Sequence, residues 1–207
     1  MTLPVLYINL EEATKRRRHI EREIRRVLRA PTFAPRRIVG ARPLAEDQGV
    51  SLNTQLLLQQ PRRAACHAQI ETTGAVGCFL SHIACWQWLS TTGDDVDAAL
   101  VLEDDACFQQ GLFEQTWRQA VEPLLQVPPA EREWDLLLLG FRDVHHTRGA
   151  TVHGIALRTF ERHERATFFG THAYVVTREA AGMLLRNARP MEVQVDAYLL
   201  VLQQLVL

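Results

Sequence analysis

Three runs of apolar residues divide the chain at intervals that suit the strands of one sheet: Leu3–Leu10, Ala98–Leu102 and Trp134–Gly140. Short continuous runs of this kind are typical of strands that are buried on both faces. Two further segments, Phe33–Val39 and Phe169–Thr177, are also predicted to be strands.

Segments with helical periodicity lie between these strands. In the first, from Glu12 to Leu28, the apolar residues Ile20, Ile24 and Val27 recur at a spacing that places them on one helix face. Further helices are predicted from Thr73 to Leu89, from Leu112 to Leu125 and from Arg178 to Asn187. The alternation predicts an α/β fold, a sandwich with a mainly parallel central sheet flanked by helices.

The polar segment from Phe141 to Glu164 interrupts this alternation. It carries four histidines, at positions 145, 146, 153 and 163, whose spacing fits no metal-binding template. We therefore expect a mobile surface loop that could act as a lid over a site.

Composition leaves the class of protein broad. The chain has 207 residues, 47% apolar and 23% charged, which suits a single globular domain over residues 1–207. The net charge of −1 gives no support for a nucleic-acid partner. Four cysteines without a Cys-x-x-Cys pair argue against a zinc site and for a reducing, cytoplasmic setting. No apolar run approaches the ~20 residues of a membrane span.

Charge is concentrated in the first predicted helix. Between Lys15 and Arg29 there are eight Lys or Arg residues against two Glu residues. One interpretation is a solvated face with ion pairs along the helix. The other is peripheral contact of residues 15–29 with an anionic membrane surface. Arg16 and Arg17, in the first turn after a strand, could instead point toward a nucleotide phosphate.

The three consecutive acids Glu103, Asp104 and Asp105 follow the apolar run Ala98–Leu102 directly. In open α/β sheets, ligands bind at the carboxyl ends of the strands. Adjacent carboxylates repel one another, and a divalent cation with oxygen ligands would relieve this repulsion and hold an anionic substrate. The alternative is a solvated corner between strand and turn, where Asp is common.

Two glycines, Gly74 and Gly77, open the helix that precedes these acids. Glycine lets the backbone approach a ligand closely, and the free N–H groups of a helix start favour anions. His82 in the same helix is either a core histidine or a ligand-binding group. Asp196 places a single carboxylate in an apolar setting near the end of the chain, as a candidate base or as a capping residue.

Together these segments resemble glycosyltransferase family 25, the lipooligosaccharide and collagen galactosyltransferase group. The motifs occur in the family's order: Tyr7-Ile-Asn-Leu10 with Arg16-Arg17, Gly74-x-x-Gly77-Cys78-x-x-Ser81-His82-x-x-x-Trp86, Val101-Leu-Glu103-Asp104-Asp105, Trp134–Gly140, Gly170-Thr-His172-Ala-Tyr174 and Pro190–Asp196.

The resemblance implies a GT-A-like (Rossmann-like) fold with a nucleotide-sugar half, about 1–110, and an acceptor half, about 111–207. It implies inverting, metal-dependent transfer of a sugar, usually galactose from UDP-galactose, to a hydroxyl of a lipooligosaccharide, lipopolysaccharide (LPS) or other glycan or glycolipid acceptor. The expected cofactor is Mn²⁺ or Mg²⁺, and the expected location is the cytoplasm, peripherally on the inner face of the cytoplasmic membrane.

The resemblance also implies residue roles. Asp105 and Glu103 would bind the metal ion. Inversion also needs a base that takes the acceptor proton, and the single carboxylate of Asp196 is our candidate for it. The donor would be bound by residues from four segments: Asn9, Arg16, Arg17, Gly77, Ser81, His82, Glu103, Asp104 and His172.

Two departures keep other readings open. The family usually has Glu where this chain has Ala75, and the sequence stops soon after Asp196. An inactive or truncated relative that binds a nucleotide sugar or a protein partner is therefore an alternative, and a metal-dependent phosphoryl or nucleotidyl transferase is a third. The apolar end, Leu199–Leu207, would pack on the chain itself, pair with a second copy in a homodimer, or mark a chain that has been cut short.

Overall fold

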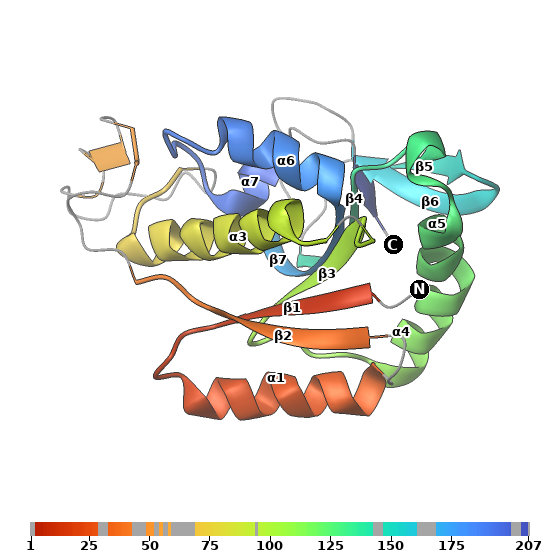
Figure 1. Ribbon diagram of the computed structural model, residues 1–207, viewed down its shortest axis with the longest axis horizontal. Coiled ribbons are helices and arrows are strands. Elements are labelled where there is room, and N and C mark those ends of the chain that lie inside the picture. Colours follow the sequence, from red (N-terminus) through yellow and green to blue (C-terminus); the bar gives the residue numbers. More distant parts are fainter. Residues whose placement is uncertain are drawn as a thin grey trace.

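One eight-stranded sheet forms the centre of the protein (Figure 1). The computed structural model describes residues 3–28, 33–42, 49–51, 54–55, 58, 69–93, 95–142, 147–160, 169–199 and 204–206. The strands are β1 (Leu3–Asn9), β2 (Phe33–Val39), β3 (Ala98–Glu103), β4 (Leu136–Arg142), β5 (Thr147–Val152), β6 (Ile155–Phe160), β7 (Phe169–Thr177) and β8 (Gln204–Val206). The helices are α1 (Thr14–Val27), α3 (Thr73–Thr91), α4 (Gln110–Thr116), α5 (Glu122–Gln126), α6 (Arg178–Asn187) and α7 (Val195–Leu199). A π-helical turn, Trp117–Val121, joins α4 to α5, and a short 3-10 helix, Pro129–Glu131, follows.

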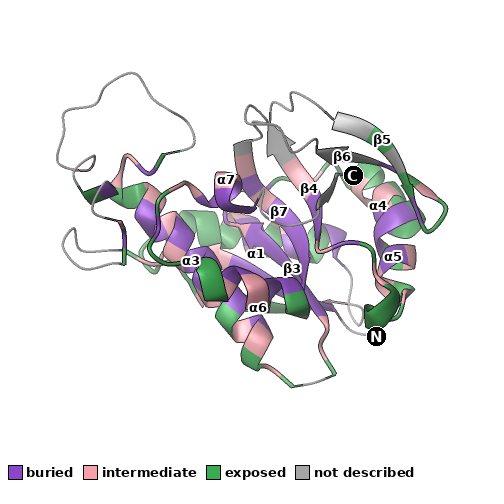
Figure 2. Ribbon diagram, turned by 90° about the horizontal axis from the view of Figure 1, so that it is seen from above, coloured by how far each residue is buried: buried purple, intermediate pink, exposed green. Residues whose placement is uncertain are grey.

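Helices cover both faces of this sheet, which confirms the α/β sandwich. Alternate residues of β3 enter different cores: Val101 packs with α3, α6 and α7, whereas Leu100 and Leu102 pack with α1 and the π-helical turn. Figure 2 shows the buried residues concentrated where β3 and β7 pass between the helices. Burial on both faces explains why the strand residues are continuously apolar instead of alternating with polar ones.

The strand order is β2-β1-β3-β7-β4-β8-β6-β5. The half containing β2, β1 and β3 is parallel, as predicted. The sheet as a whole is mixed, because β7 runs antiparallel to both β3 and β4, and β6 runs antiparallel to β5 and β8. The alternation of strands and helices does not encode strand direction, which is why the expected mainly parallel sheet needs this correction.

The expected loop from Phe141 to Glu164 is wrong for its described part, because β5 and β6 form an antiparallel hairpin there. The two turn residues, His153 and Gly154, have φ angles of 49° and 78°. Positive φ at both positions is the signature of a type I′ turn, which matches the twist of the flanking strands. The other three histidines of the segment lie outside the described residues.

The last described strand, β8, pairs with β4 and β6, so residues 204–206 pack on the chain itself. Among the helices that the structure describes, none combines the length and the apolar character that crossing a membrane requires.

Candidate functional site

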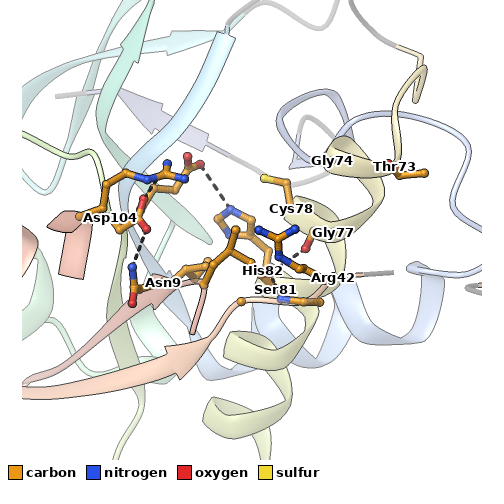
Figure 3. Close-up of a pocket in the computed structure, with 15 residues that line it drawn as sticks. Asn9, Arg42, Thr73, Gly74, Gly77, Cys78, Ser81, His82 and Asp104 are labelled. Atoms are coloured by element: carbon orange, nitrogen blue, oxygen red, sulfur yellow. Dashed lines mark hydrogen bonds and ion pairs between the residues drawn. The ribbon is translucent and has the colours of Figure 1, made fainter. Parts of the chain in front are cut away.

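A cavity of about 380 Å³ lies where the carboxyl ends of β1 and β3 meet the first turns of α3 (Figure 3). Seven of the predicted site residues line it: Asn9, Arg16, Gly77, Ser81, His82, Glu103 and Asp104. The other four, Arg17, Asp105, His172 and Asp196, are not among its lining residues. The parallel pairing of β1 with β3 is what brings the first and third of the predicted motifs together.

Asp104 is held by two neighbours from the amino-terminal segment. The amide nitrogen of Asn9 donates to Oδ2 of Asp104 over 2.7 Å, and Arg16 lies 3.1 Å from Oδ1. Asn9 and Asp104 are buried, with exposed fractions of 1% and 7%, whereas half of the Arg16 side chain reaches solvent. Each oxygen of Asp104 thus has one partner, and the Asp104 carboxylate orients Arg16 at the cavity.

Glu103 is fixed through one of its two oxygens. The Thr171 hydroxyl donates to Oε1, and Nε2 of His82 lies 3.5 Å from the same atom. Burial by itself raises the pKa of this carboxyl, but the hydrogen bonds from His82 and Thr171 outweigh it and hold the pKa below its usual range. Glu103 is thus an anion on the cavity wall, and Oε2 has no hydrogen bond from a described residue.

His82 is completely buried, and both of its ring nitrogens have partners. Nδ1 lies 2.8 Å from the Tyr174 hydroxyl, which also accepts a hydrogen bond from Nε1 of Trp86 over 3.1 Å. Nε2 lies 3.3 Å from Oγ1 of Thr171. His82 is therefore both a core histidine and a residue of the cavity wall, so the two interpretations of this residue do not exclude each other.

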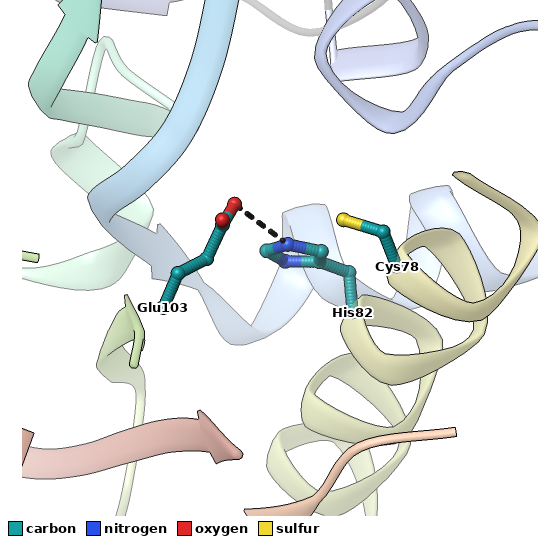
Figure 4. A group of neighbouring side chains, drawn as sticks. All are labelled: Cys78, His82 and Glu103. Atoms are coloured by element: carbon teal, nitrogen blue, oxygen red, sulfur yellow. Dashed lines mark ion pairs between the residues drawn. The ribbon is translucent and has the colours of Figure 1, made fainter. Parts of the chain in front are cut away.

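Figure 4 shows a mixed group of possible metal ligands, formed by Cys78, His82 and Glu103 with ligand atoms within 4.8 Å of one another. Such a sulfur, nitrogen and oxygen set would suit zinc, but only with a thiolate and a bare imidazole nitrogen. Burial raises the pKa of the Cys78 thiol, with the charges of Glu103, Asp196 and Asp105 adding to the effect, which disfavours the thiolate that zinc would need. The trio does not fit a zinc centre in this arrangement.

Carboxylate oxygens are the ligands that Mn²⁺ and Mg²⁺ prefer, and Glu103 and Asp105 offer such oxygens. Oε2 of Glu103 is free among the described residues, and the Asp105 side chain is exposed just beyond the end of β3. Asp105 also acts electrostatically on Cys78, a residue of the cavity wall. The predicted pair Glu103 and Asp105 is therefore the better candidate for an ion at the cavity.

The amino end of α3 forms the opposite wall. Gly74 and Gly77 line the cavity, and the Thr72 side chain caps the helix by accepting from the Ala75 N–H over 3.0 Å. The Ser81 hydroxyl donates to the Gly77 carbonyl and accepts from the Ala41 N–H. Ser81 thus ties α3 to the segment after β2 and holds the cavity wall, with its only proton already committed.

Arg17 points along α1, where it pairs with Glu21 over 2.8 Å, and so contributes no charge to the cavity wall. Arg42, which pairs with Glu12, lines the cavity in its place. Nothing in the local pattern around Arg42 singles it out. It reaches the site because it follows β2, which lies beside β1.

Asp196 lies in the first turn of α7, and the N–H of Gly170 at the start of β7 donates to Oδ2 over 3.3 Å. Burial raises the pKa of Asp196, against hydrogen bonds from backbone N–H groups, and the charge of Glu103 raises it further. The charge of Glu103 thus acts on Asp196, and the pKa of Glu103 lies below its usual value while that of Asp196 lies above it. His172 stands beside them, with its ring over Gly170.

Comparison with known proteins gives a family match and several partial relatives. The model of a family described as "Glycosyltransferase family 25 (LPS biosynthesis protein)" matches residues 2–199. The "Probable inactive glycosyltransferase 25 family member 3" of Bos taurus is 32% identical over 117 residues, 56% of this chain and 18% of that protein.

Two further relatives give the same picture. The "Inactive glycosyltransferase 25 family member 3" of Homo sapiens is 36% identical over 85 residues, 41% of this chain and 13% of that protein. The "Procollagen galactosyltransferase 1" of Danio rerio is 28% identical over 140 residues, 64% of this chain and 21% of that protein. The chain spans about a fifth or less of the length of these curated relatives.

The family match runs through almost the entire sequence, and three of the six motifs that suggested the family meet at the cavity between β1, β3 and α3. The chain therefore belongs to glycosyltransferase family 25.

Proposed function

We propose that the chain is an inverting, metal-dependent galactosyltransferase that uses UDP-galactose as donor. The observation that supports this most is the composition of the cavity, which combines two cations, a helix start and a clustered acidic strand end. Arg16, Arg42 and the first N–H groups of α3 suit a diphosphate. Glu103 and Asp105 suit the divalent cation that accompanies a diphosphate.

Each of these groups would have a distinct part in the reaction. Arg16 and Arg42 would orient the diphosphate and stabilise the charge that develops as it leaves the sugar. A bound Mn²⁺ or Mg²⁺ ion, held by Glu103 and Asp105, would supply Lewis-acid stabilisation of the same leaving group. The acceptor hydroxyl must lose a proton as it attacks the opposite face of the sugar, and we assign this proton to Asp196. A carboxylate with a raised pKa is better suited to accept a proton than an ordinary exposed one.

The acceptor would be a hydroxyl group of a glycan or glycolipid, as in LPS. Contact with such a substrate at a membrane would involve the solvent face of α1, where Lys15, Arg18, Arg22 and Arg25 recur at helical spacing. All four are exposed, and none of them forms an ion pair with a carboxylate in the part of the chain that the structure describes. The other arginines of this helix, Arg16, Arg17 and Arg26, do form such pairs. We propose that these four cations contact anionic lipid headgroups.

A second candidate is a relative that binds a nucleotide sugar without transferring it. Two of the relatives are described as inactive, and the site has Ala75 where a carboxylate is usual in the family. The Ala75 side chain is partly buried and packs against the hydrophobic core between α3 and the sheet. The binding groups of the cavity would serve this function equally well, so only turnover separates the two candidates.

Release of UDP from a panel of UDP-sugars, with Mn²⁺ or with a chelator, tests the proposal. We expect slow, metal-dependent hydrolysis of UDP-galactose that the Asp105→Asn variant loses. Metal-dependent UDP binding without turnover would favour the non-transferring relative. A folded protein that neither binds UDP nor releases it would refute both candidates.

A further inference from the structure

Trp86, Tyr174, His82 and Glu103 form a chain of polar groups from the core between α3 and β7 to the cavity wall. Three of the four side chains are completely buried, so each proton in the chain needs a defined acceptor. The positions of these protons can be assigned from the chemistry of the groups at each end.

At the inner end, the indole N–H of Trp86 can only donate, and it donates to the Tyr174 hydroxyl oxygen. Among the described residues, the Tyr174 hydroxyl proton then has one acceptor, Nδ1 of His82 at 2.8 Å. Nδ1 must therefore be the bare, accepting nitrogen of the ring.

At the outer end, Nε2 of His82 faces two oxygens. The hydroxyl of Thr171 uses its proton in the hydrogen bond to Oε1 of Glu103. Toward Nε2 of His82, 3.3 Å away, the Thr171 oxygen can therefore only accept a hydrogen bond. The Glu103 oxygen, 3.5 Å away, is also an acceptor. Nε2 must therefore carry the proton, which is the same tautomer that the inner end requires.

We propose that Tyr174 is a positioning residue for the donor site, because its hydroxyl holds His82 in the tautomer that bonds one oxygen of Glu103 and leaves the other oxygen for the ligand. Tyr174 is completely buried and is not among the residues that line the cavity, so it acts only through His82. That the ligand is a nucleotide diphosphate with its metal ion rests on the proposed function. The assignment of the protons does not.

The same assignment explains why the trio of Figure 4 is not a metal centre. A metal ion would need the Nε2 lone pair, and therefore a proton on Nδ1. The Tyr174 hydroxyl would then receive two donors and have no acceptor for its own proton among its described partners. The Trp86 and Tyr174 pair thus directs His82 toward Glu103 and away from metal binding.

¹⁵N NMR of ligand-free protein that contains ¹⁵N-labelled histidine tests the tautomer of His82 directly. The His82 signals can be assigned by their loss in the His82→Gln variant. We expect a protonated Nε2 and a bare Nδ1. A proton on Nδ1 with a bare Nε2 would overturn the proposal and would favour the mixed metal centre instead.

Titration calorimetry with UDP in the presence of MnCl₂ then tests the link to the site. The Tyr174→Phe variant keeps the ring but loses the hydroxyl, and we expect UDP to bind at least about fivefold more weakly, the factor typical of one lost hydrogen bond. In the same variant the His82 signals should show both tautomers.

Tyr198→Phe is the matched control. Tyr198 belongs to the same core cluster, and its hydroxyl donates to the Leu184 carbonyl over 2.7 Å without touching His82. The Tyr198→Phe variant should lose about as much thermal stability as Tyr174→Phe, but its UDP affinity and its His82 signals should equal those of the wild type. Equal UDP affinity in wild type and Tyr174→Phe, or equal weakening in both variants, would refute the positioning role. If the wild type binds no UDP, the proposed function fails, while the tautomer in the wild type still decides the proton assignment.

Discussion

Replacing Asn9 with Asp tests whether the buried carboxylate of Asp104 depends on the neutral amide of Asn9. The Asn9 amide lies 2.7 Å from a carboxylate oxygen of Asp104, and both residues are buried. The Asn9→Asp substitution would place two carboxylates at this distance. Two like charges about 4 Å apart repel by about 4 kcal/mol at the effective dielectric constant of partly buried sites. Arg16 would offset a part of this repulsion.

The variant has a pH dependence that a packing defect would lack. Two coupled carboxylates relieve their repulsion by binding a proton, so the pKa of the pair in the folded protein lies above the value of about 3.9 for Asp in the unfolded chain. A raised folded-state pKa favours folding at low pH, and this contribution disappears as the pH rises through that pKa. The loss relative to wild type should therefore be about 3 kcal/mol at about pH 8 and clearly smaller at about pH 5.

Urea unfolding of wild type and variant at the two pH values measures this difference. Asn187→Asp is the control, since Asn187 is exposed on α6 and its amide bonds only a backbone carbonyl. It should change stability by about 0.5 kcal/mol or less, equally at both pH values. A loss in Asn9→Asp that is the same at both pH values would refute the reasoning, as would no loss at all.

Three further results are expected. Asp196→Asn should lower turnover by about 10²-fold to 10⁴-fold, while UDP binding measured by calorimetry is retained. In the wild type, the pH at which turnover falls on the acid side should lie above the usual pKa of Asp, because burial raises the pKa of Asp196. A fall in turnover at the ordinary pKa of Asp would count against Asp196 as the base. Gly170→Ala should cost about 1–3 kcal/mol in urea unfolding, because Gly170 has a φ of 96° and an added Cβ would collide with the His172 ring; an unchanged midpoint would contradict this. Replacing Lys15, Arg18, Arg22 and Arg25 with Gln should abolish co-sedimentation with anionic vesicles at low salt, at about 1 kcal/mol per charge, whereas wild-type protein that ignores such vesicles would rule out the membrane contact.

The hydrophobic pattern predicted most of the architecture because each strand and helix carries its own signal. The apolar runs correspond to β1, β3 and β4, and the last predicted helix matches α6 at both ends. The β5–β6 hairpin was missed because its turn is His153-Gly154, where the usual signal is Asn-Gly or Asp-Gly. Its strands are also partly exposed at the sheet edge, so their apolar alternation is weak.

The candidate site could be predicted only where the residues belong to motifs at strand ends or helix starts. Glu103 and Asp104 were identified in this way and Asn9 through the resemblance to the family, and the structure brings them together at one cavity. Thr171 and Tyr174 were not assigned roles, because their partners lie far away in the sequence, and strand order is not encoded locally. Arg17 faces Glu21, since two adjacent arginines on a helix point in different directions.

The position of β7 between β3 and β4 has a consequence for how the protein folds. Because β7 is antiparallel to β3, its first residues meet the end of β3, and Thr171 reaches Glu103 across 68 positions of sequence. Contacts at such separation close large loops and tend to form slowly. The cavity would therefore be completed late, after the chain has been synthesised well past the acidic motif. Ligand binding would then report on the fully folded molecule, and a fragment ending near residue 110 would lack it.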